Sequence, residues 1–126
     1  MTMKFYKCDT CGKIIEVVKE TNVPTVCCGQ NMKEIVPGAV DAAVEKHVPA
    51  VQICCDEVKV CIGEAEHPMM DAHYIEWVLV ETDKGSMKKN LKPGCTPKVC
   101  FCLGKNEKVI AVYAYCNLHG LWKKEM

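Results

Sequence analysis

Cysteine and histidine are the residues of this 126-residue chain whose types and spacing could do chemistry. Cys116 and His119 share the segment AYCNLHGLW. Their spacing allows a chelating pair, a nucleophile with its base, or a buried thiol beside a surface histidine. The other histidines, His47, His67 and His73, precede this segment along the chain. Four imidazoles and one thiolate together make a mononuclear metal site geometrically plausible.

A second set of donors lies near the start of the chain. Cys8 and Cys11 form a C-x2-C knuckle, which lets two thiolates converge on one metal from a tight turn. After a 15-residue gap, Cys27 and Cys28 supply another pair. Neighbouring side chains in an extended segment point apart, so the backbone must bend if adjacent cysteines bind one ion. Soft thiolates accept iron or zinc, and the spacing alone leaves both metals open.

Composition restricts the class of protein that carries these donors. The eleven cysteines are odd in number and cannot all pair within one chain. The N-terminus lacks the apolar stretch of a signal peptide and no later run approaches a membrane span, so a soluble cytoplasmic protein with reduced thiols is expected. Net charge is zero, arginine is absent and the lysines are scattered, which argues against nucleic-acid binding.

Two structural units are expected to position the donors. Residues 1–37 contain short β-rich runs, and about 35 residues are too few for a self-sufficient core, so this unit should need a metal or a partner. Residues 38–126 carry strand candidates separated by turn signals, which predicts an antiparallel β-sandwich. A short helical or loop passage is expected at residues 44–47, without a long amphipathic helix. The expected strands are residues 51–54, 58–62, 74–82, 98–103 and 109–115.

The cysteines outside both donor sets are interpreted as small buried hydrophobes, with a third metal site or a redox disulfide as the alternative. They are Cys54, Cys55, Cys61, Cys95, Cys100 and Cys102. In the segment VCFCL, Cys100 and Cys102 share one strand face and apolar residues take the other, so the strand is expected to be buried. Trp77 and Trp122 are expected to pack, with Trp122 close enough to His119 to form part of a site wall.

The donor motifs resemble those of known iron proteins. The N-terminal cysteine pattern is similar to desulforedoxin, a small iron protein with a distorted four-cysteine site, and this favours iron over zinc. The segments EKHVP, HPMMDAH and CNLHG together resemble the active-site motifs of superoxide reductases. With a desulforedoxin-like unit before them, nearly the whole chain resembles the desulfoferrodoxin family, the two-iron form of superoxide reductase.

This resemblance implies a mainly β fold: a small metal-stabilised desulforedoxin-like domain, then an immunoglobulin-like antiparallel β-sandwich. It implies two mononuclear non-haem iron ions, one bound by four cysteines and one bound by four histidines and a cysteine. The implied ligands of the first iron are Cys8, Cys11, Cys27 and Cys28. The implied ligands of the second iron are His47, His67, His73 and His119 as equatorial donors, with Cys116 as the axial thiolate.

The implied activity is the one-electron reduction of superoxide to hydrogen peroxide without oxygen release, followed by re-reduction from an external donor. The mobile Glu-Lys pair of the family falls on Glu45 and Lys46. Lys46 would draw in superoxide and stabilise developing negative charge, and Glu45 would help to displace the product. A rubredoxin-type donor and a homodimer are the implied partners. The alternative function is a non-catalytic iron electron-transfer or metal-binding protein, whose sites are closed to substrate.

Overall fold

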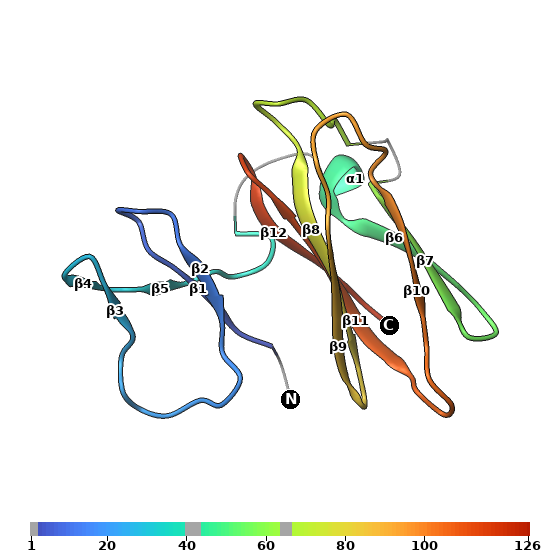
Figure 1. The fold of residues 1–126 in the computed structure, drawn as a ribbon, viewed down its shortest axis with the longest axis horizontal. Helices are drawn as coiled ribbons and strands as arrows, with labels where there is room; N and C mark the ends of the chain where they lie inside the picture. The colour runs from blue at the N-terminus through green and yellow to red at the C-terminus, as the bar shows by residue number, and fades with distance from the viewer. Residues whose placement is uncertain (1–2, 40–43, 64–66) are drawn as a thin grey trace. The chain divides into compact units, whose positions relative to one another are not determined.

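The computed structural model of the chain describes residues 3–39, 44–63 and 67–126, except for the side chains of residues 44 and 45. The chain divides into two compact units, Met1–Val36 and Pro37–Met126, drawn in Figure 1. The prediction of a mainly β chain is confirmed. In the described residues, every regular element is a strand except the four-residue helix α1 (Val44–His47). Among those residues, no helix is long and apolar enough to cross a membrane.

Short strands build the first unit. They are β1 (Phe5–Lys7), β2 (Ile14–Glu16), β3 (Val26–Cys27), β4 (Gln30–Asn31) and β5 (Lys33–Glu34). Strand β1 pairs antiparallel with β2 on one side and β5 on the other, while β3 and β4 form a separate hairpin. Within the described part of this unit, the buried apolar side chains are Phe5, Cys8 and Met32. Such a core is far too small to stabilise a fold by apolar burial alone.

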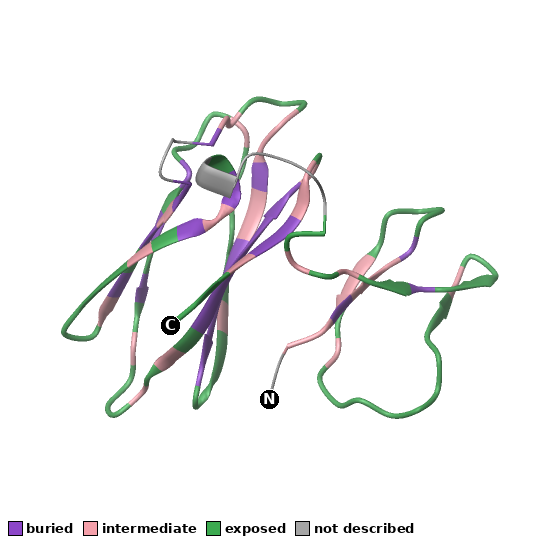
Figure 2. Ribbon diagram, turned by 180° about the vertical axis from the view of Figure 1, so that it is seen from behind, coloured by how far each residue is buried: buried purple, intermediate pink, exposed green. Residues whose placement is uncertain are grey.

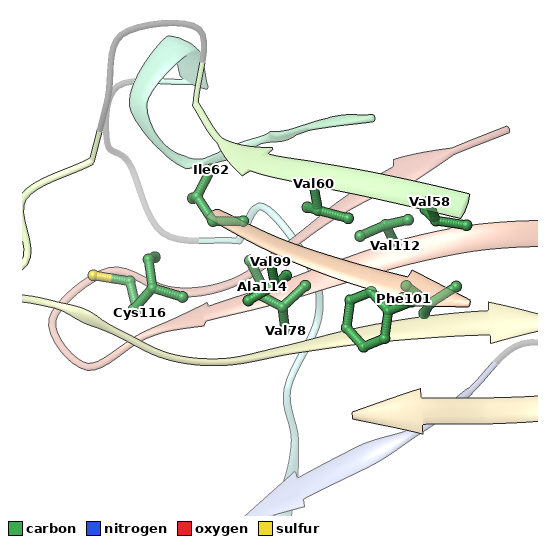
Figure 3. Packing of buried hydrophobic residues seen from close by; sticks show 11 residues of the cluster. Val58, Val60, Ile62, Val78, Val99, Phe101, Val112, Ala114 and Cys116 are labelled. Carbon is green, nitrogen blue, oxygen red and sulfur yellow. The ribbon is translucent and has the colours of Figure 1, made fainter. Parts of the chain in front are cut away.

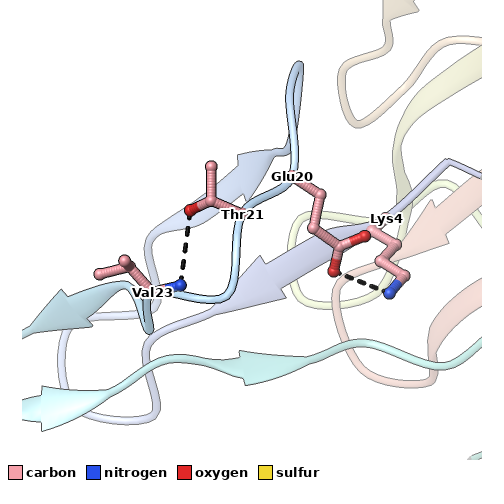
Figure 4. Close-up of polar contacts among 4 residues, drawn as sticks. All are labelled: Lys4, Glu20, Thr21 and Val23. Atoms are coloured by element: carbon pink, nitrogen blue, oxygen red, sulfur yellow. Dashed lines mark hydrogen bonds and ion pairs between the residues drawn. The ribbon is translucent and has the colours of Figure 1, made fainter.

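Polar contacts at the surface of the first unit add little stability. The Lys4 ammonium lies 2.8 Å from a Glu20 carboxylate oxygen, and the Val23 amide donates to the Thr21 hydroxyl at 3.4 Å (Figure 4). The Lys4 and Glu20 side chains are 36% and 51% exposed. Exposed ion pairs of this kind contribute little, because water screens the charges and holding two long side chains in place costs entropy. The unit therefore depends on another source of stability, and the four cysteines are the obvious candidates.

The second unit is a sandwich of two antiparallel sheets, as the sequence predicts. Its strands are β6 (Pro49–Cys54), β7 (Glu57–Ile62), β8 (Ile75–Thr82), β9 (Gly85–Asn90), β10 (Lys98–Cys102), β11 (Val109–Cys116) and β12 (Gly120–Glu125). One sheet has the order β10-β7-β6 and the other the order β12-β11-β8-β9. Figure 1 shows the helical turn α1 directly before β6, at one end of this sandwich.

The core lies between these two sheets and is built mainly from inward-facing residues of β7, β8, β10 and β11. Its buried members are Val58, Val60, Ile62, Ile75, Val78, Val80, Val99, Phe101, Val112, Ala114 and Cys116. Figure 2 shows the buried class concentrated along the strands of the sandwich. Figure 3 shows Cys116 at one end of the cluster, with its sulfur pointing away from Val99 and Ala114. This end of the core meets the second donor set.

Two strands, β9 and β12, are absent from the sequence prediction. The β9 sequence GSMKKN lacks an apolar alternation because this strand lies at the edge of its sheet, beside β8, and is largely exposed. The β12 sequence GLWKKE places its two apolar residues next to each other, so it too lacks a two-residue period. Both strands are fixed by pairing with a neighbour rather than by their own pattern.

The expectation that the remaining cysteines are buried is wrong. Five of the six are exposed and Cys61 is half-buried. Strand β10 is an edge strand whose residues alternate: Val99 and Phe101 point into the core, while Cys100 and Cys102 point outward. The two-residue period is present, but the outer face of this sheet meets solvent instead of a second layer. All eleven cysteines are free thiols.

Candidate metal centres

The first centre lies in the small unit, where four sulfurs converge. The sulfurs of Cys8, Cys11, Cys27 and Cys28 all lie within 4.8 Å of one another. The sulfurs of Cys11 and Cys27 are 3.7 Å apart, and the Cys11 amide donates to the Cys8 sulfur at 3.4 Å. Cys8 is buried, whereas Cys11 and Cys28 are exposed. The structure thus brings together all the residues proposed for the first iron.

A tight turn explains how adjacent cysteines reach one point. Cys27 ends β3 and pairs with Gln30 of β4, so Cys28 and Gly29 form a two-residue hairpin turn. The φ angles of Cys28 and Gly29 are 52° and 75°, the left-handed pair that characterises a type I′ turn. Only glycine adopts such angles freely, so Cys28 is held in an unfavourable conformation that directs its sulfur to the group.

The surroundings shift the pKa values of three of these thiols, lowering that of Cys8 and raising those of Cys27 and Cys28. Amide N–H groups of Cys11 and Thr10 lower the pKa of Cys8 to about 6, with the Cys11 amide the larger cause. Hydrogen bonds with the sulfurs of Cys8, Cys11 and Cys27 raise the pKa of Cys28 to about 12. A hydrogen bond with the Cys11 sulfur likewise raises the pKa of Cys27. The first thiol therefore loses its proton readily, and the negative charge of that thiolate then repels any further thiolate in the group. A soft cation among the sulfurs removes this repulsion, so the group fits a thiolate-bound metal.

The second centre draws residues from both sheets to one end of the sandwich. His47 ends α1, His67 follows β7, and His73 comes two residues before β8. Cys116 ends β11, and His119 lies in the connection to β12. One donor atom from each of these residues lies within 4.8 Å of every other. Every residue proposed for the second iron is therefore in a single group.

The four imidazoles are arranged as a square. Ring centroids are 4.6 Å apart for His47 and His67, 4.7 Å for His67 and His73, 4.9 Å for His73 and His119, and 4.8 Å for His119 and His47. The diagonal from His47 to His73 is longer, 6.4 Å. The Cys116 sulfur lies within 4.8 Å of one nitrogen of each ring. The four nitrogens and the sulfur are thus close enough together to bind one metal ion.

Unpartnered nitrogens in this group support a bound cation. The ring nitrogens His67 Nε2 and His73 Nε2 are buried and have no hydrogen-bond partner in the described structure. His67 Nδ1 donates to the Pro68 carbonyl at 2.7 Å, so Nε2 carries the free lone pair. Burial lowers the pKa of His67 to about 4 and also lowers the pKa of His73. Both rings stay neutral, the form that binds metals, and the buried lone pairs fit a metal ion.

Cys116 suits a ligand better than a nucleophile. It is fully buried, and burial raises the pKa of its thiol, with the amides of His119 and Leu118 acting in the opposite direction. Its sulfur is 4.0 Å from His119 Nδ1, and His119 Nδ1 is also 3.0 Å from His47 Nε2. A nucleophile needs a lowered pKa and access to substrate. The arrangement therefore disfavours a Cys116–His119 nucleophile pair.

Side chains around the donors fix their orientation. Trp122 stacks on His47 with centroids 4.9 Å apart, and its indole N–H donates to the His119 carbonyl at 3.0 Å. This agrees with its predicted place in the wall of the site. Sequence reasoning missed the Pro68 carbonyl and Asn117, although both are adjacent to proposed ligands. Trp77 stacks on Tyr115 instead, with centroids 5.6 Å apart.

The two residues predicted to act on substrate lie in α1. Lys46 is exposed, and its positive charge contributes to lowering the pKa of His73, after burial and the charges of His119 and His47. Its ammonium group therefore acts on the same donor group that includes His73. The Glu45 side chain lies outside the described residues.

Comparisons with known proteins agree on one family. The family model "Desulfoferrodoxin" matches residues 39–125, and "Desulfoferrodoxin, N-terminal domain" matches residues 1–35. The desulfoferrodoxin of Nitratidesulfovibrio vulgaris is 46% identical over 122 residues, covering 97% of this chain and 95% of the relative. A desulfoferrodoxin homolog of Archaeoglobus fulgidus is 43% identical over 121 residues, covering 96% and 95%.

Solved structures give the same result. The superoxide reductase from Treponema pallidum matches with a TM-score of 0.83 and 34% identity, over 99% of this chain and 100% of that one. The superoxide reductase (1Fe-SOR) from Giardia intestinalis matches with a TM-score of 0.55 and 32% identity. That match covers 65% of this chain and 97% of the Giardia chain.

Proposed function

The chain belongs to the desulfoferrodoxin family, and we propose on that premise that it is a superoxide reductase. The reaction joins one superoxide anion, one electron and two protons into one hydrogen peroxide, and it releases no oxygen. The observation that supports it most is the group of four imidazoles and one thiol, in which His47, His67 and Cys116 are buried. Ferrous iron held by these residues would supply the electron, and an external donor would return an electron to the iron.

We propose mononuclear iron in both donor groups. Five donors exceed the four that structural zinc takes, and zinc has no redox chemistry. As a ligand, the Cys116 thiolate would donate electron density to the iron, as thiolates do in haem enzymes. In the small unit, the four-sulfur group suits iron on donor chemistry, and family membership favours iron over zinc.

Metal analysis with spectroscopy tests these assignments. We expect purified protein to contain iron, with one EPR signal for each ferric centre and visible absorption from thiolate-bound iron. A small anion such as azide should shift the spectrum of the second centre only, because five donors leave one octahedral position open there, whereas four thiolates complete a tetrahedral site. If no anion shifts either spectrum, both sites are closed, which favours the electron-carrier alternative.

Lys46 is proposed to guide superoxide to the second centre. Its exposed ammonium group offers a compact positive charge and several N–H donors, and its charge reaches His73. A cation in this place attracts the anion and stabilises negative charge that develops during its reduction. Glu45 is proposed to help displace the product, because it is next to Lys46 in the sequence.

The Lys46→Ala variant tests this role by pulse radiolysis. The second-order rate with superoxide should fall, and the dependence of that rate on ionic strength should weaken, because the guiding charge is lost. Iron content should stay at the wild-type level. Lys84→Ala, at an exposed turn after β8, is the matched control and should keep the wild-type rate. Wild-type kinetics in Lys46→Ala would contradict the role.

The remaining assignments complete the proposal. Residues 1–37 form the four-cysteine iron domain and residues 38–126 the reductase domain, a division supported by the two compact units. The electron donor is a rubredoxin-type protein, and the chain acts as a homodimer in the cytoplasm. Sedimentation of the iron-loaded protein tests the dimer.

A further inference from the structure

The second donor group joins two chain segments that are far apart in sequence. His73 closes a tight turn in which the amides and carbonyls of Met70 and His73 bond to each other at 2.9 and 3.0 Å. Cys116 and His119 flank the connection from β11 to β12. A metal that binds both segments requires a fixed distance between them. Something other than the donors must therefore hold the His73 turn against this connection before metal binds.

Asn117 makes that link with three hydrogen bonds. The Tyr74 amide donates to the Asn117 side-chain oxygen at 2.9 Å. The Asn117 side-chain amide donates to the Ala72 carbonyl at 3.1 Å, and the Asn117 backbone amide donates to the Tyr74 carbonyl at 3.2 Å. The residues on both sides of His73 are thus tied to the residue that follows Cys116.

The chemistry of the asparagine side chain matches this position. It must accept one hydrogen bond from Tyr74 and donate one to Ala72, and a carboxamide does both from one planar group. Aspartate accepts but cannot donate when ionised, and it adds negative charge beside the donors. Alanine does neither. The side chain is also half-buried, so a lost bond leaves partly buried backbone groups without their partner.

The other donors are held in different ways. The His67 ring is oriented by its bond to the Pro68 carbonyl, and the His47 ring stacks on Trp122. The Trp122 indole also holds the His119 carbonyl. For His73, the pairing of Ile75 with Cys116 brings β8 beside the end of β11, and Asn117 binds backbone groups on both sides of His73. Asn117 thus supplies the side-chain bonds that fix the His73 turn beyond the end of this strand pairing.

We propose that Asn117 is a positioning residue that sets His73 relative to Cys116, and so sets the geometry of the second metal centre. The inference rests on the proposed iron site but goes beyond it, since it assigns a role to a residue that provides no donor. Groups that orient metal ligands commonly change metal affinity by about 10- to 100-fold when they are removed.

The Asn117→Ala and Asn117→Asp variants test the proposal in the full-length protein. Chelator competition should show about 10-fold or greater loss of iron affinity at the second centre in Asn117→Ala. Asn117→Asp keeps the acceptor for Tyr74, and its loss should be smaller. The EPR signal of the second ferric centre should change shape in both variants. The four-cysteine centre in the same sample should keep its signal and acts as the internal reference. Asn90→Ala, at an exposed position of β9, should match wild type.

Thermal unfolding of the metal-free variants separates positioning from stability. A purely structural role lowers the unfolding temperature while the EPR shape and the iron affinity remain unchanged, and that result overturns the proposal. If Asn117→Ala does not fold, the EPR shape and the iron affinity of the isosteric Asn117→Asp variant decide between a positioning role and a purely structural one. Wild-type protein that holds iron only at the four cysteines overturns the proposed function as well. Wild-type protein with both irons, and variants with unchanged signals, overturn the positioning role alone.

Discussion

The two metal centres differ in what surrounds them. The four-cysteine group lies in a unit whose described strands are two or three residues long, and Cys11 and Cys28 are exposed. The five-donor group lies against a continuous core, and His47, His67 and Cys116 are each at most 2% exposed. Among the described residues of the small unit, the donor Cys8 is one of three buried apolar side chains. In the sandwich, the donor Cys116 lies at one end of a core whose other members are apolar residues of the two sheets.

This difference indicates opposite relations between metal and fold. Where the core is too small, metal binding supplies the free energy of folding, as in other small metal-binding domains. Where a core of two sheets is already packed, the fold holds the donors in place before the metal arrives. Changes to the first centre should therefore alter structure, and changes to the second centre should alter chemistry.

Loss of the first centre gives the largest expected effect. In Cys8→Ser the small unit should lose its fold, because its buried sulfur, whose thiol pKa is lowered to about 6, is replaced. Hydrogen exchange should show residues 3–36 unprotected, while β8 and β11 keep wild-type protection. Cys102→Ser, at an exposed thiol outside both groups, should change neither region. Full protection of residues 3–36 in Cys8→Ser would show that the small unit folds without its metal.

Damage to the sandwich core should act independently of metal. Phe101 is 2% exposed and points into the core, so Phe101→Ala should lower the free energy of unfolding of the second unit by about 3–5 kcal/mol. Denaturant titration of metal-free protein measures it. The adjacent Cys102→Ala, on the outer face, should stay within about 0.5 kcal/mol of wild type. Equal effects at both positions would contradict the one-sided burial of β10.

Acid should weaken the metal-free sandwich through His67. Burial lowers its folded pKa to about 4 from the ordinary value of 6.5. The unfolded chain then binds more protons between these pH values, so the His67 contribution is complete above pH 6.5 and is lost as the pH falls toward 4. At about 1.4 kcal/mol for each pKa unit, the loss approaches about 3 kcal/mol. Denaturant titrations across this range should show a flatter profile for His67→Gln than for wild type.

The smallest effect concerns a second turn with adjacent cysteines. Cys55 follows the last residue of β6 and has a φ angle of 57°, close to the 52° of Cys28. Because glycine adopts this angle without strain, Cys55→Gly should raise the free energy of unfolding by about 0.5–1 kcal/mol. Cys28→Gly should instead impair the first metal centre, because it removes a sulfur from the group. Parallel unfolding and metal assays of the two variants check this contrast.

The sequence predicted the donors better than their surroundings. Residue type and spacing made a metal site of the four histidines and Cys116 plausible, and the resemblance to superoxide reductases then selected His47, His67, His73, Cys116 and His119 as the proposed ligands. Patterns with a two-residue period were enough to indicate the main strands of the sandwich. They could not reveal β9 or β12, whose positions depend on pairing with neighbours.

Burial was harder to predict than pairing. Cys100 and Cys102 alternate with apolar residues, and cysteine counts as apolar, so the pattern VCFCL indicated burial on both faces. Which face is covered depends on the position of β10 at a sheet edge, which is a property of the whole sandwich. The role of Asn117 was hidden for a similar reason, since its side-chain partners are 43 and 45 residues away along the chain.

The products formed from superoxide test the central claim most directly. Protein kept reduced by an excess of electron donor is supplied with a measured amount of superoxide, and hydrogen peroxide and oxygen are both quantified. Reduction at the second centre predicts one hydrogen peroxide for each superoxide consumed by the protein, with no oxygen formed. One hydrogen peroxide for every two superoxide anions, with oxygen released, would show disproportionation and contradict the account.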